Sequence, residues 1–119
     1  MLCLDTYAMI EIHNGNTNFI HLLDNEIVIT DITMSEFYAN IYRKYDEKTA
    51  EYWHRKLGIF CQSAPREILI KAVKFRIQNR KVNLSYFDCV GYIYAIENNH
   101  KFVTGDKEFK DREGVLFLK

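Results

Sequence analysis

The sequence predicts an α/β protein in which helices cover both faces of a central, mostly parallel sheet, as a three-layer α/β/α sandwich. Short apolar and β-branched runs alternate along the chain with longer segments whose apolar residues recur at helical spacing. This alternation favours parallel strands joined by crossover helices. The chain has 119 residues, of which 48% are hydrophobic and 27% are charged, so we expect residues 1–119 to fold as a single domain.

The first half of the chain alternates between short apolar strands and amphipathic helices. The polar run Asn14-Gly15-Asn16 ends the first expected helix. Met34, Phe37 and Ile41 recur at helical spacing and give a longer helix one apolar face. We expect strands at 2–4 and 26–30, and helices at 6–13, 17–23, 33–45 and 47–57.

The second half repeats the alternation. Pro65 suits the first turn of a helix, and Asn98-Asn99 ends the next one. That second helix is apolar all round, which indicates that it is largely buried, and Gly91 and Ala95 would let it pack closely on the sheet. We expect strands at 59–61, 101–104 and 115–118, helices at 65–79 and 85–97, and a turn or short helix at 105–109.

Four carboxylates stand where the chain is expected to switch from a strand or turn into a helix. They are Asp5, Glu36, Asp88 and Asp106. In a parallel α/β fold all four could converge at the edge formed by the carboxyl ends of the strands. Such a cluster repels itself unless cations neutralise it, and one or two Mg²⁺ or Mn²⁺ ions are the natural occupants. The pattern therefore indicates metal-assisted phosphodiester chemistry.

Helix capping is the competing explanation for each acid taken singly. Thr33 to Glu36 and Ser85 to Asp88 both match the capping-box spacing, and a strand-end aspartate can cap the helix that follows it. Asp88 shifts the balance because it is the only charged residue between Tyr86 and Ile96. A lone carboxylate on a buried helix needs a strong partner, which a metal ion or an amide cap would supply.

Polar neighbours of the acids are candidates for a supporting role. Glu36 shares a helical face with Asn40 and Arg43, a stripe that is either a cleft wall or plain solvated surface. Thr104 would offer a hydroxyl to the same cleft. Tyr7, directly after the Asp5-Thr6 pair, is the aromatic residue placed to stack on a base.

A basic stretch is the candidate RNA contact. The formal net charge is zero, so a nucleic-acid partner must be met by a local basic patch. The chain has no acid between Glu67 and Asp88, and Lys71, Lys74 and Lys81 share a helical face there. That face is either solvated surface or a strip that follows the phosphates of RNA beside the acidic site.

These residues together resemble the PIN domain family, and within it the short proteins that include the VapC-type toxins. The matching segments follow one another in order over nearly the whole chain: Leu4-Asp5-Thr6, Ser35-Glu36, Leu84-Ser85 with Asp88, and Val103-Thr104-Gly105-Asp106 with Phe109. The resemblance implies an α/β/α sandwich, an acidic site for Mg²⁺ or Mn²⁺, and endonucleolytic cleavage of single-stranded RNA. It places Asp5, Glu36, Asp88 and Asp106 on the family's acidic positions.

The expected partners are RNA, a small antitoxin protein and further copies of the chain, as a homodimer or higher homo-oligomer. The three cysteines fit no zinc pattern, and the sequence shows no signal peptide or membrane-spanning run, so we expect a cytoplasmic location and no membrane partner. One alternative is a PIN-fold module that binds RNA or protein without cleaving. Another is a haloacid-dehalogenase-like phosphatase, which needs a second aspartate where this chain has Tyr7.

Overall fold

The computed structural model describes residues 1–119 and contains a five-stranded sheet in the order β3-β2-β1-β4-β5. All four neighbouring strand pairs are parallel, and β1 lies in the centre. The predicted α/β architecture is therefore confirmed. The strands are β1 (Leu2–Leu4), β2 (Ile27–Thr30), β3 (Cys61–Gln62), β4 (Lys101–Thr104) and β5 (Val115–Phe117).

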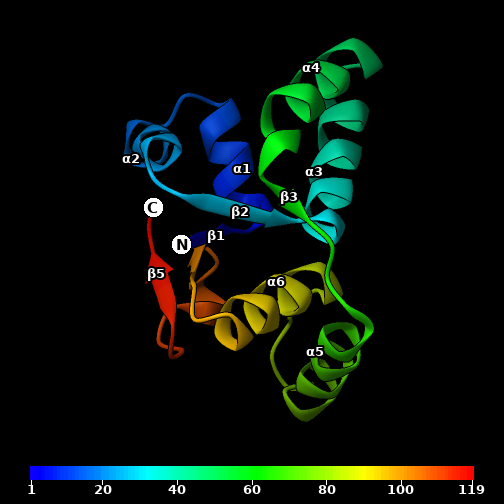
Figure 1. Ribbon diagram of the computed structural model, residues 1–119, viewed down its shortest axis with the longest axis vertical. Coiled ribbons are helices and arrows are strands. Elements are labelled where there is room, and N and C mark those ends of the chain that lie inside the picture. The colour runs from blue at the N-terminus through cyan, green and yellow to red at the C-terminus, as the bar shows by residue number, and fades with distance from the viewer.

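Helices cover both faces of the sheet and make three layers (Figure 1). One layer holds α1 (Thr6–His13), α2 (Thr17–Ile20), α3 (Asp31–Lys44) and α4 (Glu47–Leu57). The opposite layer holds α5 (Arg66–Gln78) and α6 (Tyr86–Glu97), with α6 between α5 and the sheet. Three short 3₁₀ helices complete the chain: η1 (His21–Asp24), η2 (Gly58–Phe60) and η3 (Lys107–Phe109).

Each central strand buries side chains in both helical layers. Leu4 and Val103 belong to the core beneath α1 and α3, whereas Cys3 and Phe102 belong to the core beneath α6. Successive residues of a strand point to opposite faces, so a strand sandwiched between two layers needs apolar residues throughout. This requirement explains why the strands read as continuous apolar runs.

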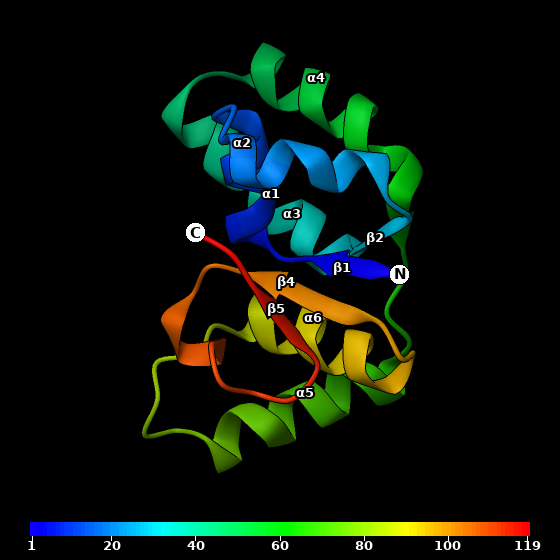
Figure 2. The ribbon, with the colours of Figure 1, turned by 90° about the vertical axis from the view of Figure 1, so that its left-hand side faces the viewer.

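The carboxyl ends of the strands gather at one edge of the sheet. In Figure 2, β1 starts near the N-terminus on the right and β5 runs toward the C-terminus on the left, so this edge lies on the left. After β3 the chain crosses to the other side of β1 and forms β4 there. The strand order therefore reverses at β1 and β4, and ligands of α/β proteins bind outside such a reversal point.

Helix α3 begins two residues earlier than predicted. The hydroxyl of Thr30, at the end of β2, accepts a hydrogen bond from the Thr33 amide at 3.1 Å and caps the helix there. Thr33 therefore lies inside the helix, and the predicted capping box from Thr33 to Glu36 is wrong. The Glu36 carboxylate is left free for another role.

Two further expectations are corrected. The strand predicted at 59–61 is wrong for its first two residues, because the chain continues from α4 into η2 and only Cys61 enters β3, where it pairs with Ile29. Ile59 is 79% exposed and so has no layer to pack against. The helix predicted at 17–23 is split, because α2 ends at Ile20 and the chain tightens into η1.

The C-terminal segment closes tightly over the end of β4. Leu118 N donates to Thr104 O at 2.9 Å, which continues the pairing beyond β5. Gly105 directly follows β4, and a Cβ atom at this position would lie 2.2 Å from Tyr7 Cε1 and 2.7 Å from the Leu118 carbonyl oxygen. The glycine is therefore needed so that the Tyr7 ring and the last backbone segment can both approach β4.

We expect Gly105→Ala to lower the free energy of unfolding by about 1–3 kcal/mol, the usual cost of overpacking. The tyrosine ring can move aside, but the Leu118 carbonyl lies on backbone that the hydrogen bond from Leu118 N to Thr104 O holds in place. Urea denaturation measures the change. Gly58→Ala is the matched control, because the nearest atom to its added methyl group would be His54 Cδ2 at 3.8 Å. Equal stability of the two variants would contradict this account.

Candidate active site

Asp5 is the most deeply buried of the four acids. It follows β1 directly and caps α1, with Oδ1 accepting a hydrogen bond from the Ala8 amide at 2.8 Å. Its other oxygen, Oδ2, is buried and has no hydrogen-bond partner. A buried carboxylate oxygen without a partner costs free energy unless a proton or a cation satisfies it. Capping therefore accounts for only one of the two oxygens.

Asp88 is brought to the edge of the sheet by the close packing of α6. A Cβ atom on Gly91 would lie 2.9 Å from the Phe102 ring, so the helix approaches the sheet as the sequence predicts. Ser85 caps α6 by accepting a hydrogen bond from the Asp88 amide at 3.1 Å. The Asp88 carboxylate makes no hydrogen bond to the Ser85 amide, so the predicted capping box is formed in one direction only.

Asp106 reaches the same edge from the end of β4. Its amide donates to the Thr104 hydroxyl at 3.0 Å, and its Oδ1 accepts from the Glu108 amide at 3.0 Å, so it caps η3. Thr104 is fully buried at the end of the strand. The threonine therefore fixes the backbone that carries Asp106, which is a supporting role at the site.

Glu36 joins the group through a contact between α1 and α3. Its Oε1 accepts a hydrogen bond from the Thr6 hydroxyl. Asn40 Nδ2 donates to the Glu36 carbonyl oxygen at 3.1 Å, and Arg43 Nη2 donates to Asn40 Oδ1 at 3.1 Å. Asn40 and Arg43 thus follow Glu36 along α3, away from the other acids, and make no hydrogen bond to its carboxylate. Both line a cavity of about 270 Å³ at the C-terminal ends of α1 and α3.

The pKa values show that the acids act on one another. Burial raises the pKa of Asp5 well above its usual value, and the charges of Asp88 and Asp106 raise it further, whereas the nearby Thr104 hydroxyl and the hydrogen bond from the Ala8 amide lower it. Burial, followed by the charges of Glu36 and Asp106, raises the pKa of Asp88 to about 7. The structure therefore brings the four carboxylates into one electrostatic cluster at the carboxyl edge.

The donors of this cluster suit a hard cation. All are carboxylate oxygens, which Mg²⁺ and Mn²⁺ prefer, and Asp5 Oδ2 offers a buried lone pair that nothing else uses. As placed, however, no three His, Cys, Asp or Glu side chains converge closely enough to hold one ion. The chemistry of the donors nevertheless fits such an ion.

One contributor to the site has almost no signal in the sequence. Thr6 is prominent there only as part of the Leu4-Asp5-Thr6 motif, yet its hydroxyl holds the Glu36 carboxylate. Its place next to Asp5 is the only hint, because the contact joins residues 30 positions apart in sequence. The Tyr7 ring, predicted to stack on a base, packs within the protein. Its centroid lies 5.9 Å from that of the Phe19 ring, and Lys119 Nζ lies 5.3 Å from the Tyr7 centroid.

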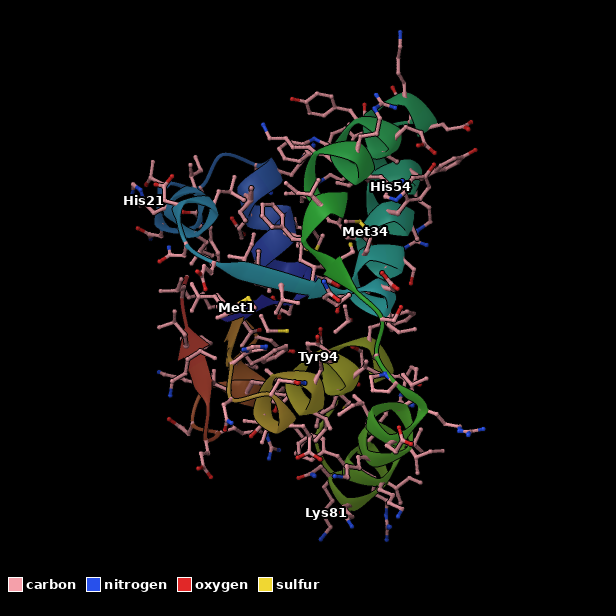
Figure 3. All side chains as sticks on the ribbon, in the orientation of Figure 1. Met1, His21, Met34, His54, Lys81 and Tyr94 are labelled. Carbon is pink, nitrogen blue, oxygen red and sulfur yellow. The ribbon has the colours of Figure 1, made fainter.

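The three predicted RNA-contacting lysines have different surroundings. The Lys71 ammonium pairs with the Glu97 carboxylate at the end of α6. Lys74 is exposed and makes no ion pair. Lys81 lies beyond the end of α5, where it lines a cavity of about 430 Å³, and Figure 3 shows it at the outer tip of the molecule. Their contact with RNA stays a prediction.

The family assignment agrees with this geometry. The family model "PIN domain" matches residues 2–115, so the chain belongs to the PIN domain family. PIN domains are typically metal-dependent nucleases. Among curated proteins, none matches the chain. None of the helices combines the length and the apolar character needed to cross a membrane.

Solved structures share the fold over nearly the whole chain. VapC20 of Mycobacterium tuberculosis, described as a toxin that cleaves the sarcin-ricin loop, has a TM-score of 0.80 at 11% identity, covering 97% of each chain. A toxin–antitoxin complex from Klebsiella pneumoniae has a TM-score of 0.77 at 19% identity, covering 98% of this chain and 96% of its own. VapBC2 of Rickettsia felis, bound to a promoter DNA fragment, has a TM-score of 0.77 at 15% identity, with coverage of 98% and 96%. Identities this low establish a common fold.

The raised pKa of Asp88 predicts that the metal-free protein loses stability as the pH rises. The carboxyl titrates near 3.8 when unfolded and near 7 when folded, so the folded state binds the proton more tightly. The stabilisation that comes from this tighter proton binding is complete below the pKa of Asp88 in the unfolded state. It is lost as the pH rises through the pKa of Asp88 in the folded state. We expect the free energy of unfolding in EDTA to fall by more than about 1 kcal/mol across this window.

Urea denaturation of wild type and Asp88→Asn at several pH values measures this contribution. The asparagine variant should show a flatter pH dependence because it cannot take up the proton. Asp24→Asn, which changes an exposed carboxylate away from the cluster, controls for the loss of one charge. The account fails if Asp88→Asn and wild type lose stability in parallel.

Proposed function

We propose that this protein is a Mg²⁺- or Mn²⁺-dependent endoribonuclease that hydrolyses phosphodiester bonds of single-stranded RNA. The observation that carries the proposal is the buried, partnerless Oδ2 of Asp5 beside the raised pKa of Asp88. Four acids held this way at the reversal point of a parallel sheet form a site for cations and for an anionic substrate. Membership of the PIN domain family supports the same activity.

Each acid has a distinct proposed role. Asp5 and Asp106 would hold the metal ion, Asp88 would bind that ion or its water, and Glu36 would bind a second ion or orient the attacking water. The Thr6 hydroxyl fixes the Glu36 carboxylate, and Thr104 fixes the backbone of Asp106. The bound ion supplies positive charge that stabilises the phosphoryl oxygens and promotes deprotonation of water.

We also propose that the protein is the toxin of a toxin–antitoxin pair, with a small antitoxin as its partner, acting in the cytoplasm as a homodimer or higher homo-oligomer. The support is that a similar fold occurs in a toxin–antitoxin complex from Klebsiella pneumoniae and in VapC20, which is described as a toxin. The alternative is a PIN-fold module that binds RNA or protein without cleaving. RNA incubated with the protein, with and without EDTA, separates the two, because only the nuclease gives cleavage that the chelator stops.

Asp5→Asn should abolish Mg²⁺- or Mn²⁺-dependent RNA cleavage and leave thermal stability unchanged or raised. Asparagine caps a helix about as well as aspartate, while the substitution removes one charge from a repelling cluster. Asp5→Ala should also lose cleavage and should in addition lose the cap, at about 1 kcal/mol. Gel assays of RNA cleavage and thermal melts report the two effects separately.

Asp46→Asn is the matched control, because Asp46 caps α4 through the Thr49 amide at 2.7 Å and lies outside the cluster. Its cleavage rate should equal that of wild type. If Asp5→Asn melts at a lower temperature and still cleaves RNA, Asp5 is a structural cap and the proposed role is wrong.

If the three lysines contact RNA, their contributions to RNA affinity should differ. Replacing Lys74 and Lys81 together by alanine should weaken RNA binding and flatten its salt dependence by up to ~0.7 log units for each phosphate that a lysine no longer neutralises. Lys71→Ala should have a smaller effect, because that ammonium is already paired with Glu97. The rate at saturating RNA should stay near wild type. Fluorescence anisotropy at several salt concentrations tests the order, and an unchanged slope in the double variant would contradict it.

A further inference from the structure

A cavity of about 430 Å³ opens where α5 ends and α6 begins. Tyr86, the first residue of α6, contributes an aromatic ring to its lining. The apolar floor beside this ring consists of branched aliphatic side chains: Val73, Ile77, Val82 and Leu84. Its volume falls in the range of sites that hold a small molecule.

The rim of this cavity is cationic. Its polar lining residues are Arg76, Arg80, Lys81 and Asn83, and no carboxylate lines it. Arg80 and Lys81 are exposed, and neither is part of an ion pair. Arg76 Nε donates to the Leu84 carbonyl oxygen at 2.8 Å, which fixes one guanidinium at the rim. Positive charge at the rim is thus available to a negatively charged group that enters the cavity.

The cavity lies next to the acidic cluster. Tyr86 stands in the same first turn of α6 as Asp88. In Figure 2 the chain between α5 and α6 lies on the left, the side on which the carboxyl ends of the strands gather. A molecule that fills the cavity would therefore extend toward the carboxylates.

Arg112 adds positive charge between the cavity and the cluster. Its Nη2 donates to Asn79 Oδ1 at the end of α5, at 3.2 Å, and its Nε donates to the Glu108 carbonyl oxygen in η3, at 3.4 Å. Asp106 caps this same η3. The guanidinium therefore joins the end of α5 to the segment that carries one of the acids, on a path that a phosphate chain could follow.

These groups suit one nucleotide of a single-stranded RNA. Its base would lie on the Tyr86 ring and the aliphatic floor, because unpaired bases stack on aromatic side chains. Its phosphate would meet Arg80 and Lys81. The Asn83 amide, which both donates and accepts hydrogen bonds, could bond to the edge of the base.

A second surface carries similar groups but lacks part of this combination. Lys48, Tyr52 and Arg55 line a cavity of about 390 Å³ on α4, with Thr49 as the remaining lining residue. No aliphatic floor supports a base there, and α4 belongs to the opposite helical layer. This surface therefore provides matched controls.

We propose that the cavity between α5 and α6 holds one nucleotide of the RNA and so positions the neighbouring phosphodiester at the carboxylates. The assignment rests on the proposed ribonuclease function, since it names where the substrate is held. Tyr86 is then a positioning residue, because it touches a nucleotide next to the bond that is cut and supplies no chemistry to the cut itself.

Mononucleotides test the cavity without RNA cleavage. In an NMR titration of the isotope-labelled protein in EDTA, AMP should bind at least ~5-fold more tightly than ribose 5-phosphate, which lacks the base. AMP should also bind more tightly than adenosine, which lacks the phosphate. The backbone amide signals that shift should be those around the cavity, at Arg80, Lys81, Asn83 and Tyr86.

Substitutions test the stacking role of Tyr86. Tyr86→Leu keeps an apolar side chain but removes the ring, so it should weaken the binding of a labelled single-stranded RNA in EDTA at least ~5-fold, the low end for the loss of one stacked base. Tyr86→Phe should bind as wild type does. The matched control is Tyr52→Leu, because Tyr52 is 50% exposed on α4, and it should not change the affinity. Circular dichroism verifies that each variant remains folded.

The same assay tests the charged rim. Arg80→Ala should weaken RNA binding and flatten its salt dependence by up to ~0.7 log units for the phosphate that it no longer neutralises. Arg55→Ala, which removes an exposed arginine from α4, is the matched control and should leave both quantities unchanged.

The nucleotide site is overturned if AMP binds no better than ribose 5-phosphate, if the shifted signals belong to α4, or if Tyr86→Leu binds RNA as Tyr52→Leu does. It is also overturned if Tyr86→Leu dissociates a dimer in sedimentation velocity and leaves RNA affinity unchanged, because the cavity then faces a second chain. If any of these results comes from a protein that cleaves RNA, the proposed nuclease activity stands and only the cavity's role is lost. A protein that binds AMP as stated yet cleaves no RNA refutes the nuclease activity and keeps the nucleotide site.

Discussion

The burial of one carboxylate governs how this molecule is arranged around its site. Asp5 is 1% exposed at the end of the central strand, and one of its oxygens is unpartnered. Burying a charged carboxylate without a partner costs free energy, and the charges of the neighbouring acids increase this cost. The buried acids therefore lower the stability of the fold at the edge of its sheet. The two hydrophobic cores on either side of the sheet must offset this loss.

The remaining acids are placed by contacts that are themselves uncharged. Gly91 lets α6 approach the sheet and bring Asp88 to the edge, and Thr104 holds the amide of Asp106. The Thr6 hydroxyl joins α1 to α3 at Glu36. The hydroxyls of Thr6 and Thr104 and the absence of a side chain at Gly91 thus position the acids. The carboxylates themselves supply the charge of the site.

The sequence predicted what is periodic or local and missed what depends on tertiary contacts. The strand-helix alternation, the buried helix at 86–97 and the acids at the strand ends follow from apolar spacing and turn residues. The start of α3 was misplaced because Thr30 and Thr33 both have capping side chains, and the path of the chain out of β2 decides between them. The tie between Thr6 and Glu36, and the pairing of Lys71 with Glu97, join distant residues and leave no pattern to read.

The central place of the first strand has a consequence for protein synthesis. β1 pairs with β2 on one side and with β4, nearly a hundred residues later, on the other. Contacts between such distant segments form late in folding. A nascent chain on the ribosome therefore carries Asp5 long before Asp106 exists to join it. The acidic cluster assembles only after Asp106 has been made, so a chain that stops before this residue lacks the site.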